Sequence, residues 1–482
     1  MPGSDTGSDI SPAWVQDAVF YQIFPDRFAR STRVHKPSNL EAWDAPPTLH
    51  GYKGGDLLGV VEKLDYLQDL GITALYLNPI FASGSNHRYH TQDFHQVDPM
   101  LGGNAALDEL IAACHKRGMR VVLDGVFNHA SRGLLQFHDI LENGSSSAYL
   151  DWFHVRHFPL HAYGGGHLGY DAWWGLAALP KFNTSTPAVR EFIYQVAEKW
   201  LAAGMDGWRL DVPNEIDDDD FWRAFRARCR AVNPDAYLVG EIWDEAGRWL
   251  KGDIFDGVMN YQFNRAVLGF VAKDLAHDEL ARSGLNGIQH LSAGAFAETA
   301  TRLLAAYPEA AVRSQLNLLG SHDTPRVATT LKGDGSALRQ AFLLLFTWPG
   351  APCLYYGDEL GLRGGHDPGC RAGMPWERRD QWDEGLLGYL RVLIRARHEF
   401  AALRRGATTV SAPADGLVVV ERRLEEEPPV WVVVNVGEGA AAVPTSVVPA
   451  GRYRDVLSGD VVEQAEGALV VAGRGGVLIT PA

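Results

Sequence analysis

Eight short apolar runs alternate with amphipathic stretches along most of the chain. The amphipathic stretches, such as 188–204, have the spacing of surface helices, and several of them end in Gly. Most of the apolar runs are rich in Val, Ile, Leu, Tyr and Phe, as parallel strands are when both faces are covered. The runs lie at 18–24, 72–78, 119–127, 205–212, 236–243, 255–261, 315–323 and 352–359. This alternation predicts an α/β fold, a (β/α)8 TIM barrel.

Two regions depart from the alternation. After the third predicted strand, a long segment rich in His, Gly and aromatic residues has little periodicity, which indicates an inserted subdomain. Beyond Gly406, β-like runs separated by Gly and Pro indicate an antiparallel sheet. We therefore predict a catalytic barrel at 1–129 and 186–404, an inserted domain B at 130–185, and a C-terminal antiparallel β-sandwich domain at 405–482.

Composition and charge narrow the classes of partner. The formal net charge of −15 argues against nucleic acid and anionic membranes, because phosphate groups repel an acidic protein. The four cysteines are scattered without a CxxC motif, as in proteins of a reducing compartment. The sequence shows neither a secretory signal nor an apolar run of about 18 residues. We expect a cytoplasmic protein.

Polar residues follow four of the predicted strands, where the active site of a TIM barrel lies. They are Asp124, Asn128 and His129 after the third strand, Arg209 and Asp211 on the fourth, Glu241 on the fifth, and His322 and Asp323 on the seventh. Glycoside hydrolysis needs one carboxylic acid to protonate the leaving oxygen and a second carboxylate to attack or to activate water. A neighbouring arginine keeps one carboxylate ionised, and a third carboxylate raises the pKa of the acid.

Four motifs make a family resemblance specific. The segments DGVFNH (124–129), GWRLDVPNE (207–215), GEIW (240–243) and LLGSHD (318–323) resemble, in order, signature regions of the α-amylase family, glycoside hydrolase family 13. The resemblance extends from about Trp14 to the C-terminus. It implies that Asp211 is the nucleophile, Glu241 the general acid/base and Asp323 the third catalytic carboxylate.

The resemblance also implies a set of substrate-binding residues. Arg209 would position the nucleophile, and His129, His322 and Tyr89 would surround the reacting sugar. Asp124 and Asn128 complete the expected set at the strand ends, with Asn128 expected to hydrogen-bond in the site.

Other features are similar to the cyclomaltodextrinase, neopullulanase and maltogenic amylase subgroup. LPKFN (179–183) and GGHDPGCR (364–371) are similar to segments of that subgroup. The likeness implies further binding residues: Glu215, Trp173 and Trp243 toward the leaving side, and Asp367 and Arg371 at subsite −2.

Two features of this sequence differ from that subgroup and change what we expect of its oligomeric state and its metal content. The subgroup carries an N-terminal β-domain that builds its dimer, whereas the first barrel strand here begins at Ala18, so we expect a monomer or a dimer that is not built on such a domain. The segment 28–40 holds almost no carboxylate, and calcium requires oxygen ligands. We therefore expect no required cofactor and no metal-binding residues, and we do not expect structural calcium.

The sequence thus predicts a retaining hydrolase of α-1,4-glucosidic bonds in cyclic or short linear maltooligosaccharides, with transglycosylation as a second outcome. Its expected partners are maltooligosaccharides, cyclodextrins or related α-glucans. The alternative is a family transferase, or a hydrolase of an α-1,6-branched, mixed-linkage cyclic or sucrose-like α-glucoside. A non-catalytic binding barrel is disfavoured because the carboxylates are retained, and a metal hydrolase because the 17 histidines form no HExxH motif.

Overall fold

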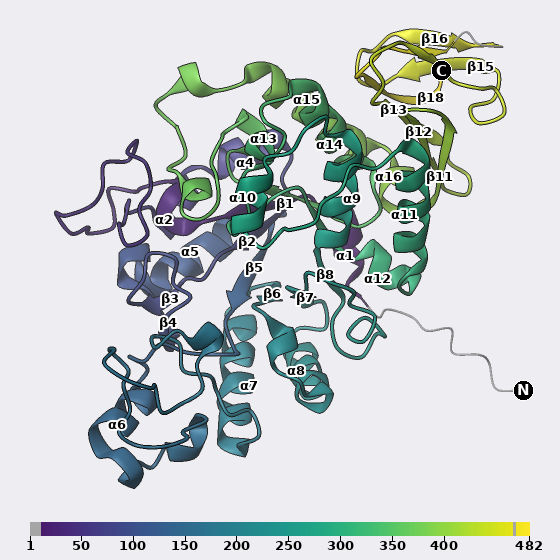
Figure 1. Ribbon diagram of the computed structural model, residues 1–482. Helices are drawn as coiled ribbons and strands as arrows, with labels where there is room; N and C mark the ends of the chain where they lie inside the picture. The colour runs from purple at the N-terminus through teal and green to yellow at the C-terminus, as the bar shows by residue number, and fades with distance from the viewer. Residues whose placement is uncertain (1–10, 466–468) are drawn as a thin grey trace, which may run out of the picture.

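A closed parallel barrel forms the centre of the molecule (Figure 1). The structure is a computed structural model that describes residues 11–465 and 469–482. Neighbouring strands follow the order β1–β10–β9–β8–β7–β6–β5–β2. Their bounds are β1 Phe20–Ile23, β2 Ala74–Leu77, β5 Arg120–Gly125, β6 Gly207–Leu210, β7 Tyr237–Gly240, β8 Gly257–Asn260, β9 Leu316–Leu318 and β10 Ala351–Tyr355. Each predicted apolar run coincides with one barrel strand, so the predicted TIM barrel is confirmed.

Helices surround the barrel, and several of the longer ones bury one apolar side. In the helix α8, Phe221, Phe225 and Cys229 recur every four residues and are buried, while the Asp218 side chain caps the first turn by accepting from the Phe221 N–H. The helices are α1 Ala13–Asp17, α2 Pro25–Phe28, α3 Leu57–Glu62, α4 Leu64–Leu70, α5 Gly103–Lys116, α6 Leu135–Asn143, α7 Pro187–Ala202, α8 Asp219–Val232, α9 Tyr261–Val271, α10 His277–Arg282, α11 Ala293–Ala305, α12 Glu309–Arg313, α13 Val327–Thr330, α14 Gly335–Thr347, α15 Glu384–Glu399 and α16 Ala401–Arg405.

A hairpin and the segment after β5 cover one side of the barrel mouth. The hairpin pairs β3 (Phe81–Ser83) with β4 (Thr91–Val97). The segment after β5 contains α6 and folds back through isolated bridges, including the pairs His129–Lys181 and Phe153–Phe182. Aromatic rings of the two parts pack together, since Phe94 of β4 contacts Phe182 with ring centroids 6.0 Å apart. The predicted domain boundaries stay a prediction.

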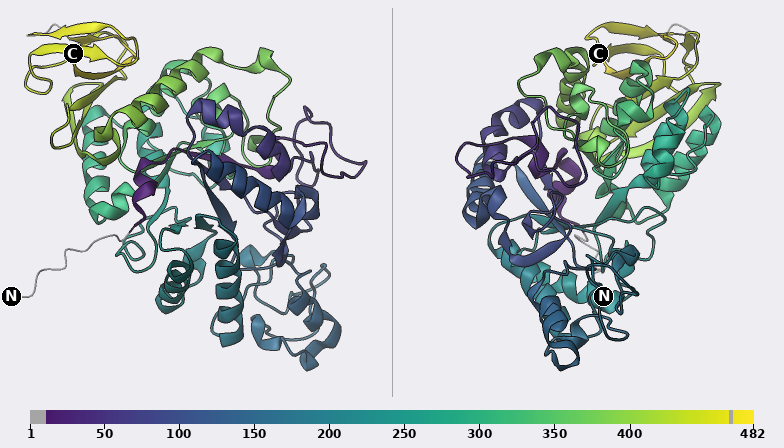
Figure 2. Two further views of the ribbon diagram at one scale, coloured as in Figure 1. Left: turned by 180° about the vertical axis from the view of Figure 1, so that it is seen from behind. Right: turned by 60° about the vertical axis from the view of Figure 1, so that its left-hand side comes forward.

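The C-terminal part is an antiparallel sheet, as predicted. Its six strands follow the order β11–β12–β13–β18–β15–β16, and β14 pairs with β17 separately. The bounds are β11 Ala407–Ala414, β12 Leu417–Arg423, β13 Val430–Asn435, β14 Ala441–Ala442, β15 Gly451–Asp455, β16 Val461–Gln464, β17 Val470–Val471 and β18 Gly476–Pro481. This sheet and α6 lie at opposite ends of the molecule (Figure 2).

Alternate residues of β12 and β13 belong to two different cores. Val418 and Val432 join the core that the barrel shares, whereas Val419 and Val433 join a small core within the C-terminal part. This assignment follows from the period of two in a strand, which sends successive side chains to opposite faces. The sheet is therefore apolar on both faces at this point.

Barrel closure between β8 and β9 depends on the absence of a side chain at Gly257. A Cβ there would lie 2.1 Å from the Ser314 carbonyl oxygen. We predict that Gly257→Ala lowers the free energy of unfolding by about 1–3 kcal/mol, because the backbone must shift. Urea unfolding measures the change. The matched control is Gly294→Ala in α11, where a Cβ meets nothing within 4 Å; equal destabilisation by both variants would contradict the prediction.

Candidate active site

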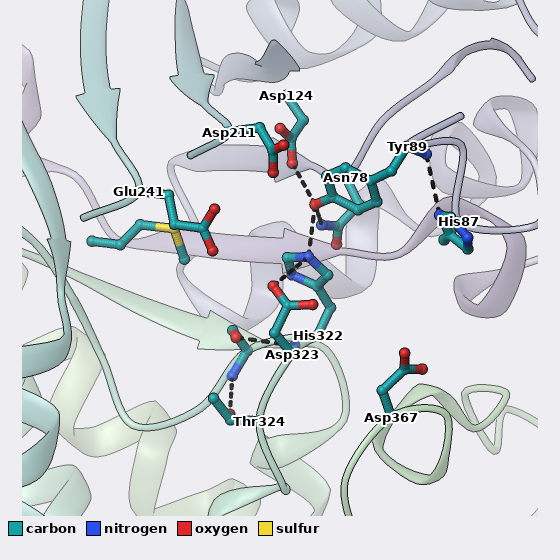
Figure 3. Close-up of polar contacts among 12 residues, drawn as sticks. Asn78, His87, Tyr89, Asp124, Asp211, Glu241, His322, Asp323, Thr324 and Asp367 are labelled. Carbon is teal, nitrogen blue, oxygen red and sulfur yellow. Dashed lines mark hydrogen bonds and ion pairs between the residues drawn. The ribbon is translucent and has the colours of Figure 1, made fainter. Parts of the chain in front are cut away.

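One arginine joins three carboxylates at the carboxyl ends of β5, β6 and β7. Arg209 is fully buried, and its Nη1 donates to Asp124 at 2.8 Å and to Asp211 at 2.9 Å. Its Nη2 lies 2.8 Å from Oε2 of Glu241. The strand register explains the arrangement, since Asp124 pairs with Arg209 across β5 and β6. Figure 3 shows the three carboxylates gathered at these strand ends. The structure thus brings together Asp211 and Glu241, the predicted nucleophile and acid.

The backbone after Asp211 is strained. Val212 has φ +36° and ψ +51°, a left-handed conformation that a β-branched residue rarely adopts. Its N–H donates to Oε2 of Glu241 at 3.2 Å. Strain of this kind persists where the surrounding structure enforces it, often at functional sites. Here it directs a backbone donor at the candidate acid.

Glu241 has a second hydrogen-bond donor. The indole Nε1 of Trp243 donates to Oε1 of Glu241 at 3.1 Å. The Trp243 ring is itself held by stacking on Tyr261, with centroids 4.0 Å apart and planes 12° from parallel. Trp243 therefore fixes the orientation of the Glu241 carboxyl.

Burial sets the protonation of the two candidate catalytic groups. Burial raises the pKa of both Asp211 and Glu241, and the Arg209 guanidinium opposes the rise in each case. Two interacting carboxyls titrate as a pair. One guanidinium between them favours a state in which one group is ionised and the other protonated, the combination that a nucleophile and an acid require.

Asp323 has a different environment from this pair. One of its oxygens lies 2.9 Å from Nε2 of His322, and the other accepts from Nη2 of Arg371 at 3.1 Å. Burial acts to raise the pKa of Asp323, but His322 and Arg371 outweigh it and hold this pKa below its usual range. Asp323 is therefore an ionised carboxylate that faces the pair.

Tyr89 links the two sides of the site. Its hydroxyl donates to Oδ2 of Asp124 at 2.8 Å and contacts Nε2 of His322 at 2.6 Å (Figure 3). The Tyr89 and His322 rings are parallel within 7°, with centroids 5.5 Å apart. Nearby, burial lowers the pKa of His129 to about 3, so this imidazole is neutral. The structure thus places Tyr89 and His322 in contact with the carboxylates, and His129 against Asn128 and Trp173.

The remaining predicted residues surround this centre. Arg371, which contacts Asp323, also lies 2.8 Å from Asp367 and so connects the loop that carries both to the site. Glu215 pairs with Lys181 at 3.2 Å and does not contact the carboxylate pair among the described interactions. Trp173 stacks on His129 with centroids 5.2 Å apart.

Asn128 is buried at the end of β5, beside His129. Its amide contacts Nδ1 of His129 at 3.2 Å, and its side-chain oxygen is buried without a hydrogen-bond partner among the described residues.

Sequence reasoning missed two polar side chains, Tyr76 on β2 and Asn78 directly after it. The hydroxyl of Tyr76 donates to Asp124 at 2.8 Å, and the Asn78 amide donates to the Tyr89 hydroxyl at 3.1 Å. Both side chains are fully buried, and their spacing of two residues places them on the same face of the strand. The hydroxyl of Tyr76 and the amide of Asn78, in the carboxyl-terminal half of the run ITALYLN, were the signal that could have identified them.

Within residues 11–465 and 469–482, no group of three or more His, Cys, Asp or Glu side chains is placed to hold a metal ion. None of the helices described there combines the length and apolar character needed to cross a membrane.

Comparisons with known proteins agree with this geometry. Residues 22–385 match the α-amylase catalytic domain family. The chain is 41% identical to a cyclomaltodextrinase of Geobacillus thermopakistaniensis over 93% of this chain and 74% of that protein. Two solved structures are similar over 98% of this chain and 99% of their own: a debranching enzyme of Nostoc punctiforme (TM-score 0.88, 44% identical) and a cyclic α-maltosyl-(1→6)-maltose hydrolase of Arthrobacter globiformis in complex with that sugar (TM-score 0.87, 38% identical).

The hydrogen bond from Trp243 gives a pH prediction. It favours the ionised form of Glu241 and so lowers the pKa of this carboxyl. Since a general acid must be protonated, activity falls as pH rises through this pKa. We predict that Trp243→Phe moves the alkaline limb of kcat/KM to higher pH by about 0.5–1 unit, the equivalent of one hydrogen bond. Tyr261→Phe is the control, because the Tyr261 hydroxyl contacts Ser321 instead. A limb that stays in place in Trp243→Phe would contradict the prediction.

Proposed function

Since this chain belongs to the α-amylase family, glycoside hydrolase family 13, we propose that it hydrolyses α-1,4-glucosidic bonds of cyclic or short linear maltooligosaccharides with retention of configuration. The chain is a hydrolase that acts on α-glucosidic bonds. The observation that carries the proposed mechanism is the ion pairing of Arg209 with both Asp211 and Glu241.

The proposed reaction has two steps. Asp211 attacks the anomeric carbon while protonated Glu241 gives its proton to the glycosidic oxygen, so the leaving sugar departs as an alcohol and a glycosyl ester forms. Glu241, now ionised, then takes a proton from water while the water oxygen attacks the anomeric carbon, and the bond between that carbon and Asp211 breaks, which releases Asp211 as a carboxylate. A sugar hydroxyl in place of water would give transglycosylation.

The surrounding residues would bind the reacting sugar. We propose that ionised Asp323 accepts hydrogen bonds from its hydroxyls and that neutral His129, with His322, provides further polar contacts. Tyr89 would stack beneath the sugar ring. Outside this set, Trp243 and Glu215 are proposed leaving-side residues, and the pair of Asp367 and Arg371 is the proposed boundary of subsite −2.

A second candidate substrate has specific support. The two similar solved structures are a debranching enzyme and a hydrolase of a cyclic glucan with α-1,6 bonds, and both match the chain over nearly its whole length. A mixed-linkage cyclic or branched α-glucan is therefore the alternative substrate class.

Chromatography of the products separates these candidates. We would incubate the protein separately with a cyclodextrin, maltotriose, starch, pullulan and a mixed-linkage cyclic tetrasaccharide. Ring opening of cyclodextrin with slow attack on starch supports the proposal, and preferred cleavage of the tetrasaccharide supports the alternative. No reducing sugar from any of the five would overturn both.

We also propose that the loop after β1 takes no calcium. The ammonium of Lys36 lies 3.0 Å from Oδ2 of the fully buried Asp56 and also donates to the Met100 carbonyl. Asp56 further accepts from the N–H groups of Ser31 and Gly59. A side-chain cation thus already neutralises this buried carboxylate, where a metal ion would otherwise be needed.

We also propose that the protein is cytoplasmic and that it is a monomer or a dimer. The four cysteines are buried free thiols, which fits a reducing compartment. Light scattering measures the oligomeric state.

The nucleophile is tested by Asp211→Asn. An amide cannot form the ester, so we predict that kcat falls by at least about ten-thousandfold while the circular dichroism spectrum is unchanged. The control is Asp65→Asn, because Asp65 is an exposed surface residue. Near-normal turnover of Asp211→Asn would exclude the proposed mechanism.

The calcium proposal has its own test. We predict that a chelator leaves the melting temperature unchanged, whereas Lys36→Met lowers the free energy of unfolding by on the order of 3 kcal/mol, because Asp56 loses its cation. Lys332→Met is the control, since Lys332 forms an exposed pair with Asp274. A fall in melting temperature on chelation of the wild type would show that a metal is bound.

A further inference from the structure

The most exposed large hydrophobic side chain in the described part of the chain lies at the edge of the site. Trp174 is 82% exposed, and Leu176 beside it is 47% exposed. Trp174 also has φ +50°, a left-handed conformation that is unfavourable for a residue with a side chain. The left-handed backbone and the exposed apolar ring are both unfavourable for the folded state. Their combination indicates that Trp174 has a role in binding and not in stability.

Trp174 is the outer end of a stack of three rings. It lies parallel to Trp173 within 9°, with centroids 4.6 Å apart, and Trp173 lies on His129 within 19°. His129 follows β5, and its Nδ1 contacts the Asn128 amide at 3.2 Å. The stack therefore runs from a buried residue at the end of this barrel strand to the surface, where Trp174 is 82% exposed.

The loop that carries Trp174 is held by backbone hydrogen bonds. The Trp173 N–H donates to the Leu179 carbonyl, and the Arg132 N–H donates to Ala178, with both distances at 2.9–3.0 Å. The Tyr170 hydroxyl also donates to the Ala177 carbonyl at 2.6 Å. Because the loop is closed at its base, Trp174 is presented in a fixed place at little entropic cost to a ligand.

We propose that Trp174 is a stacking platform for a glucosyl ring distal to the one that reacts. The flat apolar faces of glucose suit an open indole, and the stack connects this indole to the catalytic carboxylates. The inference rests on the proposed function and adds a determinant of chain length. Substrates long enough to reach Trp174 gain binding energy, whereas short ones do not.

The test compares Trp174→Ala with the wild type on maltotriose and maltohexaose. We expect KM for maltohexaose to rise about three- to tenfold, the equivalent of one aromatic stacking contact, with kcat unchanged. Both parameters for maltotriose stay the same. Trp174→Phe retains most of the preference. The control is Tyr163→Ala, which removes another exposed aromatic of the inserted segment, 74% exposed, and leaves the ratio unchanged.

Three outcomes overturn the inference. Unchanged KM for both sugars would show that no ring stacks on Trp174, and an equal loss on both would show a structural role. Light scattering provides the third: a wild-type dimer that becomes a monomer in Trp174→Ala would make this surface a subunit interface. Failure of the wild type to cleave either sugar would instead overturn the proposed function.

Discussion

The site depends on the burial of one guanidinium among three carboxylates. Arg209 is fully buried, so its charge is balanced by the carboxylates of Asp124, Asp211 and Glu241 and not by solvent. Such a cluster is tolerable only when the geometry is fixed, because a buried charge without its partner is strongly destabilising. The barrel supplies that geometry, since parallel register places the ends of β5, β6 and β7 side by side. The same constraint that stabilises the charges also holds the two catalytic candidates together.

Much of the fold was predictable because its signals are local. Burial of both faces makes most of the barrel strands predominantly apolar runs, and the polar residues at strand ends meet because parallel strands end on one rim. The hairpin of β3 and β4 was missed because its second strand, TQDFHQV, is largely polar and reads as a loop. Tyr76 and Asn78 were missed because they lie within an apolar run. The left-handed backbone of Val212 has no sequence signal, since it is imposed by tertiary contacts.

The centre and the rim of the site differ in how they are built. The central groups come from barrel strands and are fixed by many contacts at once. The rim comes from loops in which a residue is held by one or two partners, as Glu215 is by Lys181 and Asp367 by Arg371. Changes at the rim can therefore alter which α-glucan fits without disturbing the chemistry. The similarity of this chain to enzymes named for several different α-glucans is consistent with that division.

The two-faced sheet at the C-terminus limits how the protein can be divided. Val418 and Val432 belong to the same core as the barrel, so the sheet is not a module that can be removed without consequence. A chain shortened by this sheet would expose the surface of α11 and α14 against which the sheet packs, which favours aggregation over folding. Barrel and sheet should instead melt as one cooperative unit. For protein engineering, this means that fusions belong at the chain ends, and that the barrel is not a minimal catalytic fragment.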